Sequence, residues 1–378
     1  MTLVPSHTAA LCLGLLVVMV MVMVMVMVMV MVMGIEAQQQ PLVKGLSWKF
    51  YESSCPKLES IIRKQMEKVI KKDVGLAASL LRVHFHDCFV QKTAPPNLSL
   101  RGFDVIEDLR RRVHKQCGVG SVSCADITTI VARDSIVLTG GPEYKVPLGR
   151  RDGLTFATRN ATLVNLPSPF VPTGMLLTNF ATKNFDATDV VALSGAHTIG
   201  VAHYPSFTSR LYPTQDPTMD KTFASTLKRV CPNTTTNATT FLDIRSPNTF
   251  DNKYFLDLEK KQGVLTSDQD LYTDERTRGI VTSFAVNQTL FFEKFVDVMV
   301  KMGQMEVLTG TQGEIRNNCS RRDSQQMLWA KLKRRAYIDC CRRRGHGQRR
   351  ELLRLSNAFG FRVVRVLSIN VCVLLFKY

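Results

Sequence analysis

Three signatures that identify many binding proteins are missing from this 378-residue sequence. It has no glycine-rich phosphate loop, no Cys-x-x-Cys pair of the kind that holds a structural zinc ion, and no internal repeat outside one Val-Met tract. Segments that alternate apolar and polar residues, the pattern of half-buried strands, are also few. These absences disfavour a nucleotide-binding α/β domain, a zinc-finger protein, a repeat protein and a mostly-β fold.

Basic residues are absent before the first apolar run, so the run has no charge signal for its orientation. It covers residues 9–35 and includes the Val-Met alternation from Val18 to Met33. A secretory signal has an apolar centre of about 7–15 residues, whereas about 20 apolar residues can span a bilayer, so the length permits both. We favour a signal peptide over residues 1–37, removed near Ala37. An uncleaved membrane anchor is the alternative.

Six Asn-x-Ser/Thr sequons support export when they are taken together with this N-terminal segment. They begin at Asn97, Asn160, Asn233, Asn237, Asn287 and Asn318. The sequence therefore favours a secreted glycoprotein.

Acidic residues are scarce at the C-terminal end, where residues 324–378 hold 13 Lys and Arg but only two acids. About +11 of the formal charge of +17 lies in this tail, and the body is only mildly basic, so we expect no nucleic-acid partner. We assign residues 323–378 to a basic tail outside the fold. An unrelated reading frame or a retained intron is the favoured interpretation, and a membrane- or polyanion-binding extension is the alternative.

From Tyr51 onward the apolar residues recur near the helical period of 3.6, and the loops are short. This pattern predicts an all-α fold. The expected helices are Glu59–Ile70, Asp104–Val113, Asp126–Leu138, Gly174–Phe180, Ala187–His197, Asp251–Lys261 and Thr273–Met302.

The apolar helix-forming run Leu76–Leu81 is followed directly by charged and aromatic side chains. Arg82 and His86 are four residues apart and share a helical face, with Phe85 beside them to exclude water. A permanent cation next to a base that titrates near neutrality suits proton transfer with stabilisation of negative charge. A buried helix whose His86 bonds to the backbone and whose Arg82 pairs with Asp87 explains the same residues equally well.

A second apolar segment places a histidine near the end of a helix. The helix is expected to begin at a cap, Asp186 or Thr188, to carry His197 in its last turn, and to end near Gly200. Taken alone, a single histidine on such a helix is more often a hydrogen-bonded core residue than a metal ligand.

These two segments together resemble the secreted plant peroxidases. RVHFHDCFV at residues 82–90 is similar to the distal haem motif of that family, and VVALSGAHTIG at residues 190–200 is similar to its proximal motif. The likeness runs from about Trp48 to Ser320 and includes SCAD at 123–126 and GRRD at 149–152, in which Asp126 would pair with Arg150. It implies haem b held between two helical domains, which we assign to residues 38–322.

The resemblance also implies roles for individual residues. His86 would be the catalytic acid–base and Arg82 the cation that stabilises charge, while His197 would be the axial ligand of the haem iron. Asp268 would polarise that histidine from behind. From the residues alone, Asp268 is an ordinary turn aspartate. Asn97 would accept a hydrogen bond from the distal histidine.

Pro167 lies in Leu166-Pro167-Ser168-Pro169, which is similar to the family's motif at the exposed haem edge, where donors bind. Without the resemblance it would be part of a rigid loop.

A proximal calcium site is implied by four hard oxygen donors, although capping and turn chemistry would also explain them. They are Thr198, Asp243, Ser246 and Asp251. A distal calcium site would retain only Asp87 and the carbonyl of Val90, which is too few for an ion that takes about 6–8 oxygens.

The distal site is incomplete because the family's sequence block directly after Gln91 is missing here. Family matching pairs Cys55 with Cys117 and Cys124 with Cys319. It also leaves Cys88 without its partner in the missing block, and Cys231 opposite Tyr204 where the family has cysteine. We expect two of four disulfides to form.

The expected function is hydrogen-peroxide-dependent, one-electron oxidation of small phenolic donors by a monomeric haem enzyme in the plant cell wall. Two alternatives remain: a catalytically impaired secreted glycoprotein that binds haem and calcium, and a membrane-tethered peroxidase-like protein, if the N-terminal segment is retained.

Overall fold

The computed structural model describes residues 16–27, 41–89, 100–155, 165–232, 238–321 and 323. Residues 16–27 form a helix with exposed apolar side chains, and no helix in the described ranges is long and apolar enough to cross a membrane. The expected cleavage near Ala37 and almost all of the basic tail lie outside these residues. Met1–Cys319 forms one compact unit, and Ser320–Tyr378 is assigned to a second.

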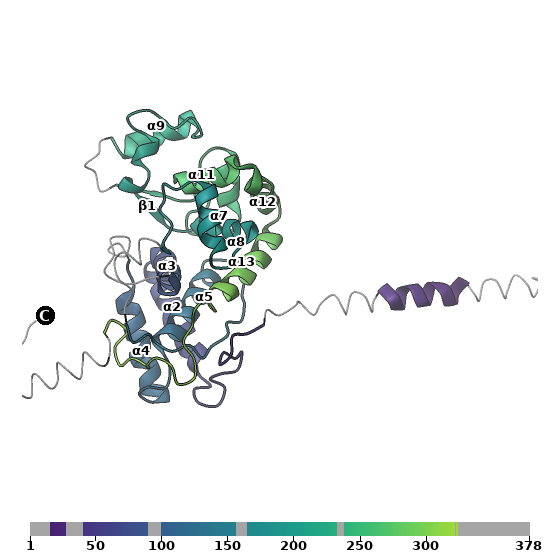
Figure 1. Ribbon diagram of the computed structural model, residues 1–378, viewed down its shortest axis with the longest axis vertical. Coiled ribbons are helices and arrows are strands. Elements are labelled where there is room, and N and C mark those ends of the chain that lie inside the picture. The colour runs from purple at the N-terminus through teal and green to yellow at the C-terminus, as the bar shows by residue number, and fades with distance from the viewer. Residues whose placement is uncertain are drawn as a thin grey trace, which may run out of the picture. The chain divides into compact units, whose positions relative to one another are not determined.

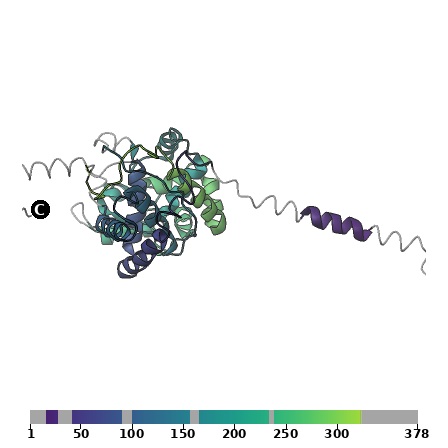
Figure 2. The ribbon, with the colours of Figure 1, turned by 90° about the horizontal axis from the view of Figure 1, so that it is seen from below.

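The first half of the body is a set of mutually packed helices (Figures 1 and 2). Helix α2 buries one stripe of apolar side chains, four residues apart, against the rest of the set. The stripe consists of Leu58, Ile62, Met66 and Ile70. Nearly every side chain of α5 is buried, so this helix forms the centre of the set. The helices are α2 (Leu58–Lys72), α3 (Gly75–Phe89), α4 (Phe103–Cys117) and α5 (Cys124–Val137).

The second half is built from shorter helices around a cluster of phenylalanines. Phe291 contacts Phe250, Phe255, Phe284 and Phe295 with ring centroids 4.9–5.9 Å apart. These rings join α10, α12 and α13 into the same core. The helices are α7 (Thr173–Ala181), α8 (Ala187–Ser194), α10 (Lys253–Glu259), α11 (Thr266–Thr273), α12 (Glu275–Val286) and α13 (Gln288–Met302).

The single helix predicted over Thr273–Met302 is wrong, because the chain breaks it at two capping residues. Asp274 leaves helical geometry and caps α12, which begins at Glu275, because its side chain accepts a hydrogen bond from the backbone N–H of Arg276. Asn287 does the same for α13 through the backbone N–H of Leu290. Both residue types favour N-caps over helix interiors, so the signal was present in the sequence.

A two-stranded ribbon and a small second core add to the helical body, and the sequence did not predict either. β1 (Val201–His203) pairs antiparallel with β2 (Thr239–Phe241), so that Ala202 lies opposite Thr240. The ribbon and α9 (Lys221–Val230) are close to a separate buried cluster that includes Tyr204 and Cys231. Short 3-10 turns, η3 (Tyr204–Ser206) and η4 (Thr208–Arg210), connect these elements. The fold remains mainly helical, as expected.

A buried arginine ties the two halves together. Arg150 donates to Asp126 of α5 at 3.1 Å, which confirms the pairing expected between these residues, and its Nε donates to the carbonyl of Gly303 after α13 at 2.7 Å. Asp126 also accepts from Tyr51 at 2.9 Å. Both oxygens of Asp126 accept hydrogen bonds, which offsets much of the cost of burying the pair, while one terminal nitrogen of Arg150 is buried without a partner among the described residues.

Candidate active site

His197 lies in a 3-10 turn that continues α8. Asp186 begins α8 with a reciprocal capping box, in which its carboxylate accepts from the backbone of Asp189 at 2.8 Å. The α-helix ends at Ser194, earlier than expected, and η2 (Gly195–Thr198) is the tighter turn that carries His197. Gly195 permits this because an added Cβ would lie 2.4 Å from the ring of Phe291.

The ring of His197 is held from behind by a buried carboxylate. Nδ1 of His197 donates to Oδ1 of Asp268 at 2.8 Å, and the Tyr254 hydroxyl donates to the same oxygen at 3.0 Å. Asp268 is 2% exposed, whereas the His197 side chain is 39% exposed. This geometry fixes the tautomer of His197 and leaves Nε2 for another partner.

The electrostatics of this pair favour the charged form of the imidazole. Burial lowers the pKa of His197, but the negative charge and hydrogen bond of Asp268 outweigh burial, so the net pKa is raised above 6.5. The positive charge of Arg82 lowers the pKa of His197. A distal side chain therefore lies close enough to the proximal histidine to act on it.

On the distal side, α3 presents Arg82 and His86 as expected for residues one helical turn apart. Nε of Arg82 donates to Nε2 of His86 at 3.1 Å, so this nitrogen carries a lone pair. His86 is buried, whereas Arg82 is exposed. The Phe85 ring meets the His86 ring edge-on, with centroids 5.9 Å apart.

The two histidine-bearing segments also approach each other through their backbones. Gly200, just after η2, has φ +104, and an added Cβ would lie 2.8 Å from Cβ of Ala78 in α3. Glycine at this position allows α3 to lie close to the chain that leaves His197.

The four predicted calcium ligands lie close together at the end of η2. The Thr198 hydroxyl donates to Asp243 at 2.9 Å and lies 3.4 Å from Asp251, and the Ser246 hydroxyl donates to Asp251 at 2.9 Å. Thr198 and Asp243 are fully buried. The backbone carbonyl of Thr249 lies 3.4 Å from the Thr198 hydroxyl. Its oxygen is a further candidate calcium ligand, which was not predicted from the sequence.

The predicted donor-binding loop runs beside the helix that carries Asp268. Pro167 is half-buried, and two residues later the carbonyl of Pro169 accepts from the backbone of Ser267 at 3.1 Å. The loop is thus attached to the first turn of α11.

Val90 and Asn97 lie outside the described residues, as does the side chain of Cys88. Asp87 lies in the last turn of α3 with an exposed side chain.

Comparison with known proteins identifies the family. A sequence model of the peroxidase family matches residues 62–287 of this chain. The chain belongs to the peroxidase family. Peroxidase 12 of Arabidopsis thaliana is 56% identical over 311 residues, covering 77% of this chain and 87% of the relative. A cationic peroxidase of Sorghum bicolor is 51% identical over 307 residues, covering 76% and 85% respectively.

A more distant relative is the lignin-forming anionic peroxidase of Nicotiana tabacum, 40% identical over 301 residues, with 73% of this chain and 92% of the relative covered. These relatives make the chain a plant peroxidase, an enzyme that uses hydrogen peroxide to oxidise small-molecule donors. Plant peroxidases of this kind use haem and are secreted.

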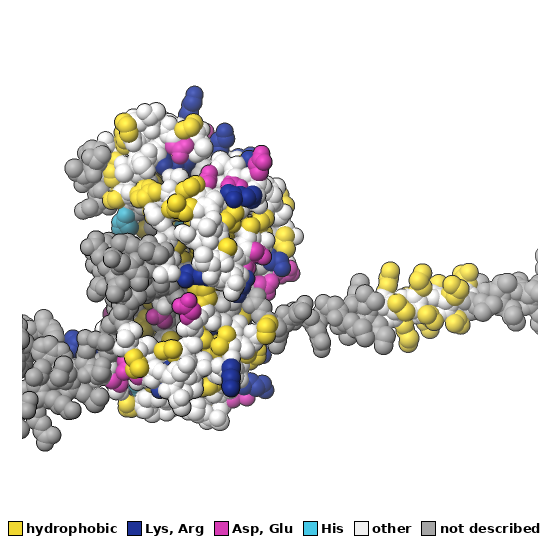
Figure 3. Space-filling view, viewed as in Figure 1, with side chains coloured by type: hydrophobic (Ala, Val, Ile, Leu, Met, Phe, Trp, Pro, Cys, Tyr) yellow, Lys and Arg dark blue, Asp and Glu magenta, His cyan; other side chains and the backbone are white. Residues whose placement is uncertain are grey.

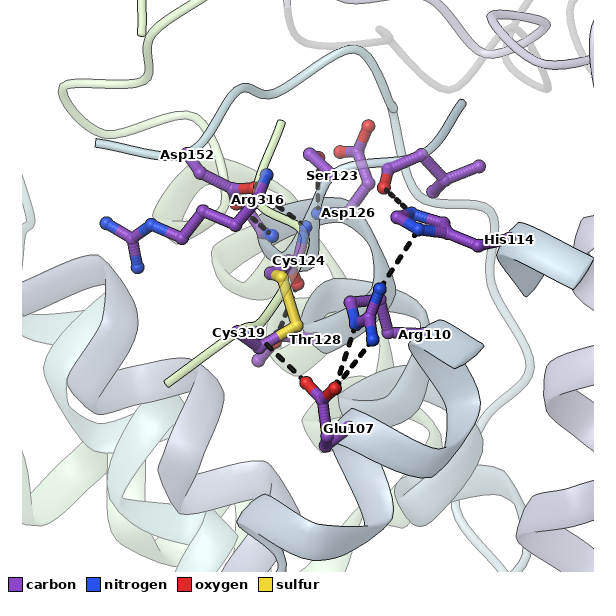
Figure 4. The surroundings of a disulfide bond; sticks show 12 residues. Glu107, Arg110, His114, Ser123, Cys124, Asp126, Thr128, Asp152, Arg316 and Cys319 are labelled. Atoms are coloured by element: carbon purple, nitrogen blue, oxygen red, sulfur yellow. Dashed lines mark hydrogen bonds and ion pairs between the residues drawn. A yellow bond between two sulfur atoms is a disulfide. The ribbon is translucent and has the colours of Figure 1, made fainter. Parts of the chain in front are cut away.

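Both expected disulfides of this peroxidase are present. Cys55 is bonded to Cys117 and Cys124 to Cys319. Figure 4 shows the second bond at the start of α5, where the backbone N–H of Cys319 also donates to Glu107 at 3.1 Å. The disulfide joins the segment around Cys319 to α5, and the hydrogen bond joins the same segment to α4. Cys231 is free and fully buried, as expected, and burial raises the pKa of its thiol.

Three further residues near these sites were missed at the level of sequence. Tyr254 shares the Asp268 oxygen with His197, and its spacing to Asp268 gave no sign of this contact. Asp257 is fully buried behind the calcium-ligand cluster, and burial, with Asp243 contributing, raises its pKa to about 7. His84 of α3 is buried, and burial with the charge of Arg150 lowers its pKa to about 3. His84 lay in the distal motif, but its neutral, buried state depends on tertiary packing.

Proposed function

We propose that this chain is a secreted haem peroxidase that oxidises small phenolic donors one electron at a time. The carrying observation is the His197–Asp268 hydrogen bond of 2.8 Å on one side, with Arg82 and His86 on the helix that approaches from the other. Within the described residues, Oδ2 of Asp268 is buried without a hydrogen-bond partner, and both donors to this carboxylate, His197 and Tyr254, bind Oδ1.

The residues fit haem. Nε2 of His197 is the ligand we assign to the iron, because Nδ1 is occupied by Asp268 and keeps its proton there. When bound, haem supplies the redox chemistry that links peroxide reduction to oxidation of the donor. Asp268 makes the imidazole a stronger electron donor to that group.

Two distal side chains would handle the protons and charge of peroxide. Nε2 of His86 has the lone pair needed to take a proton from hydrogen peroxide and return it to the leaving oxygen. Arg82 now donates to that nitrogen, so peroxide must displace it and then finds the guanidinium beside the developing negative charge. Phe85 excludes water from one side of His86.

Calcium would bind at the cluster formed by Thr198 and the Asp243–Asp251 loop. Two carboxylates, two hydroxyls and the Thr249 carbonyl are the hard oxygen donors that this ion prefers. Because Thr198 follows His197 directly, the ion would hold the turn that positions the axial ligand. Phenolic donors would bind along the Pro167 loop, which is tied to α11 through Ser267.

Reconstitution with haem tests the roles separately. The full chain should develop a Soret band and oxidise guaiacol with hydrogen peroxide. We expect His197→Ala to lose the band and His86→Leu to keep the band but lose turnover. The matched control is His203→Gln, an exposed histidine on β1, which should keep both. If His86→Leu turned over normally, the assigned distal base would be wrong.

The missing distal block should reduce turnover more than haem binding. The alignment with the Arabidopsis relative spans 311 positions, more than 77% of a 378-residue chain, so that relative has residues without a counterpart here. A misplacement of about 1 Å in a catalytic group can cost about 100-fold in rate. A version with the family's block inserted after Gln91 should therefore show the same Soret band and faster guaiacol oxidation. Equal turnover would contradict the proposed distal defect.

A further inference from the structure

A pocket of ≈ 340 Å³ opens beside α11, and no residue assigned above to haem, calcium or donor binding lines it. Its lining is two cations, a tyrosine ring, a hydroxyl and an amide, from Lys261, Gln269, Tyr272, Thr273 and Arg278. The volume suits a small organic molecule. The face of the body seen in Figure 3 mixes acidic, basic and apolar side chains.

Lys261 has a backbone conformation that its residue type disfavours. Its φ is +59, in the left-handed region. It directly follows Lys260, the C-cap residue of α10. Glycine is the usual residue at this place in a helix C-terminus, since a Cβ is strained there. The backbone is fixed by hydrogen bonds from the N–H of Lys261 to Leu258 and from Asp220 to the carbonyl of Lys261. A lysine that a rigid turn holds in a disfavoured backbone conformation points to a function of its side chain.

Neither cation of the pocket forms a close ion pair within the described part of the chain, although the charge of Asp274 acts on Arg278 from a longer distance. Nε and one terminal nitrogen of Arg278 donate to the carbonyls of Tyr272 and Thr273, at 3.0 and 2.7 Å, which fixes the guanidinium at the end of α11. The nearby carboxylate of Asp274 is bound by Arg276 at 2.5 Å.

The amide of Gln269 makes the base of the pocket rigid. Its Oε1 accepts from Gly263 at 3.1 Å, and its Nε2 donates to Leu258 at 2.9 Å. Gln269 therefore clamps the turn that carries Lys261 to α11, and the lining is pre-organised before any ligand arrives.

We propose that this pocket binds a small aromatic carboxylate. The carboxylate would lie between Lys261 and Arg278, with its ring against Tyr272. Guanidinium and ammonium groups favour carboxylate, and a tyrosine face favours an aromatic ring. Tyr272 lies one helical turn after Asp268 on α11. A ligand in the pocket would therefore contact the same helix whose Asp268 orients His197. The proposal concerns binding and does not rest on the peroxidase mechanism.

Titration calorimetry on the haem-loaded full chain tests this, with 4-hydroxycinnamate as the probe and the uncharged 4-hydroxycinnamyl alcohol as its partner compound. We expect the acid to bind at a site where the alcohol does not. Lys261→Gly and Arg278→Gln should each weaken that binding by about tenfold, the loss expected for one charge-assisted hydrogen bond. Lys260→Gln, the exposed neighbour, is the matched control and should leave the affinity unchanged.

The thermal unfolding midpoint separates a ligand-binding lysine from a structural one. Because glycine relieves the left-handed strain, Lys261→Gly should unfold at the same temperature as the parent chain or higher, while it loses affinity for the acid. Equal binding of acid and alcohol, or unchanged affinity in both Lys261→Gly and Arg278→Gln, would overturn the proposal.

Discussion

Replacing Asp268 with asparagine should destabilise the haem-free chain in a way that depends on pH. Oδ1 of Asp268 accepts from both His197 and Tyr254, and Asp268 raises the pKa of His197. A raised pKa in the folded state means that the protonated histidine stabilises the fold. That contribution is fully present below the unfolded value near 6.5 and is lost as pH rises through the folded pKa.

The size of the effect follows from what the substitution removes. A hydrogen bond to a charged group contributes about 1.5–3 kcal/mol, so the loss in free energy of unfolding at about pH 5 should be of that order. At a pH above the folded pKa of His197 the histidine is neutral, and only neutral donors face the buried carboxylate. The pKa of Tyr254 is raised well above 10, so its hydroxyl still donates. The penalty for Asp268→Asn should then be small, because a poorly compensated buried charge has also been removed.

Urea unfolding of the haem-free chain at both pH values measures this difference. Asp270→Asn is the matched control, since Asp270 accepts from the backbone of Thr173 at 2.6 Å and does not contact His197. It should destabilise the chain by similar amounts at both pH values. An equal penalty for Asp268→Asn at both would refute the assigned coupling. In the haem-loaded chain the same substitution should weaken haem retention by about 10–100-fold, as is usual for the partner of a ligating histidine.

Three further outcomes are expected. Calcium should raise the thermal unfolding midpoint measured by scanning calorimetry, and a chelator should lower it. Asp243→Asn should remove most of this response. If the response were unchanged, Asp243 would not be a calcium ligand. Deleting residues 324–378 should leave the Soret band of the haem-loaded chain intact, and loss of the band would make the tail part of the fold. Gly195→Ala should lower the free energy of unfolding by about 1–3 kcal/mol through overpacking against Phe291, which a urea titration would detect, and an unchanged midpoint would contradict the close contact.

Local patterns predicted the fold well where one residue type decides the outcome. The stripe in α2 and the cap at Asp186 could be predicted from spacing and side-chain chemistry alone. The break at Asn287 was missed because the apolar period continues across it, so periodicity outweighed the capping residue. The β1–β2 ribbon was also missed, since three-residue strands are too short for alternation to stand out.

The candidate site could be predicted only through resemblance, because its contacts join distant segments. His197 and Asp268 are 71 residues apart. Neither a single histidine on an apolar helix nor an aspartate in a turn predicts a hydrogen bond over that separation. Tyr254 and the carbonyl of Thr249 were missed for the same reason: they come from loops and short helices whose approach depends on the Phe291 core. Spacing within one helix, by contrast, was enough to place Arg82 beside His86.

The packing of α3 indicates which distal group would be more sensitive to the predicted loss of the family's block after Gln91. Leu80, Leu81 and His84 are buried in the body, and His84 stays neutral because burial and the nearby charge of Arg150 lower its pKa to about 3. Arg82 lies between these anchors. His86 follows them and is the nearer of the two to Gln91, after which the block is predicted to be missing. The defect should therefore fall on proton transfer by His86 more than on charge stabilisation by Arg82. A loop-restored chain should accordingly differ from this one mainly in the pH dependence of kcat/KM for peroxide.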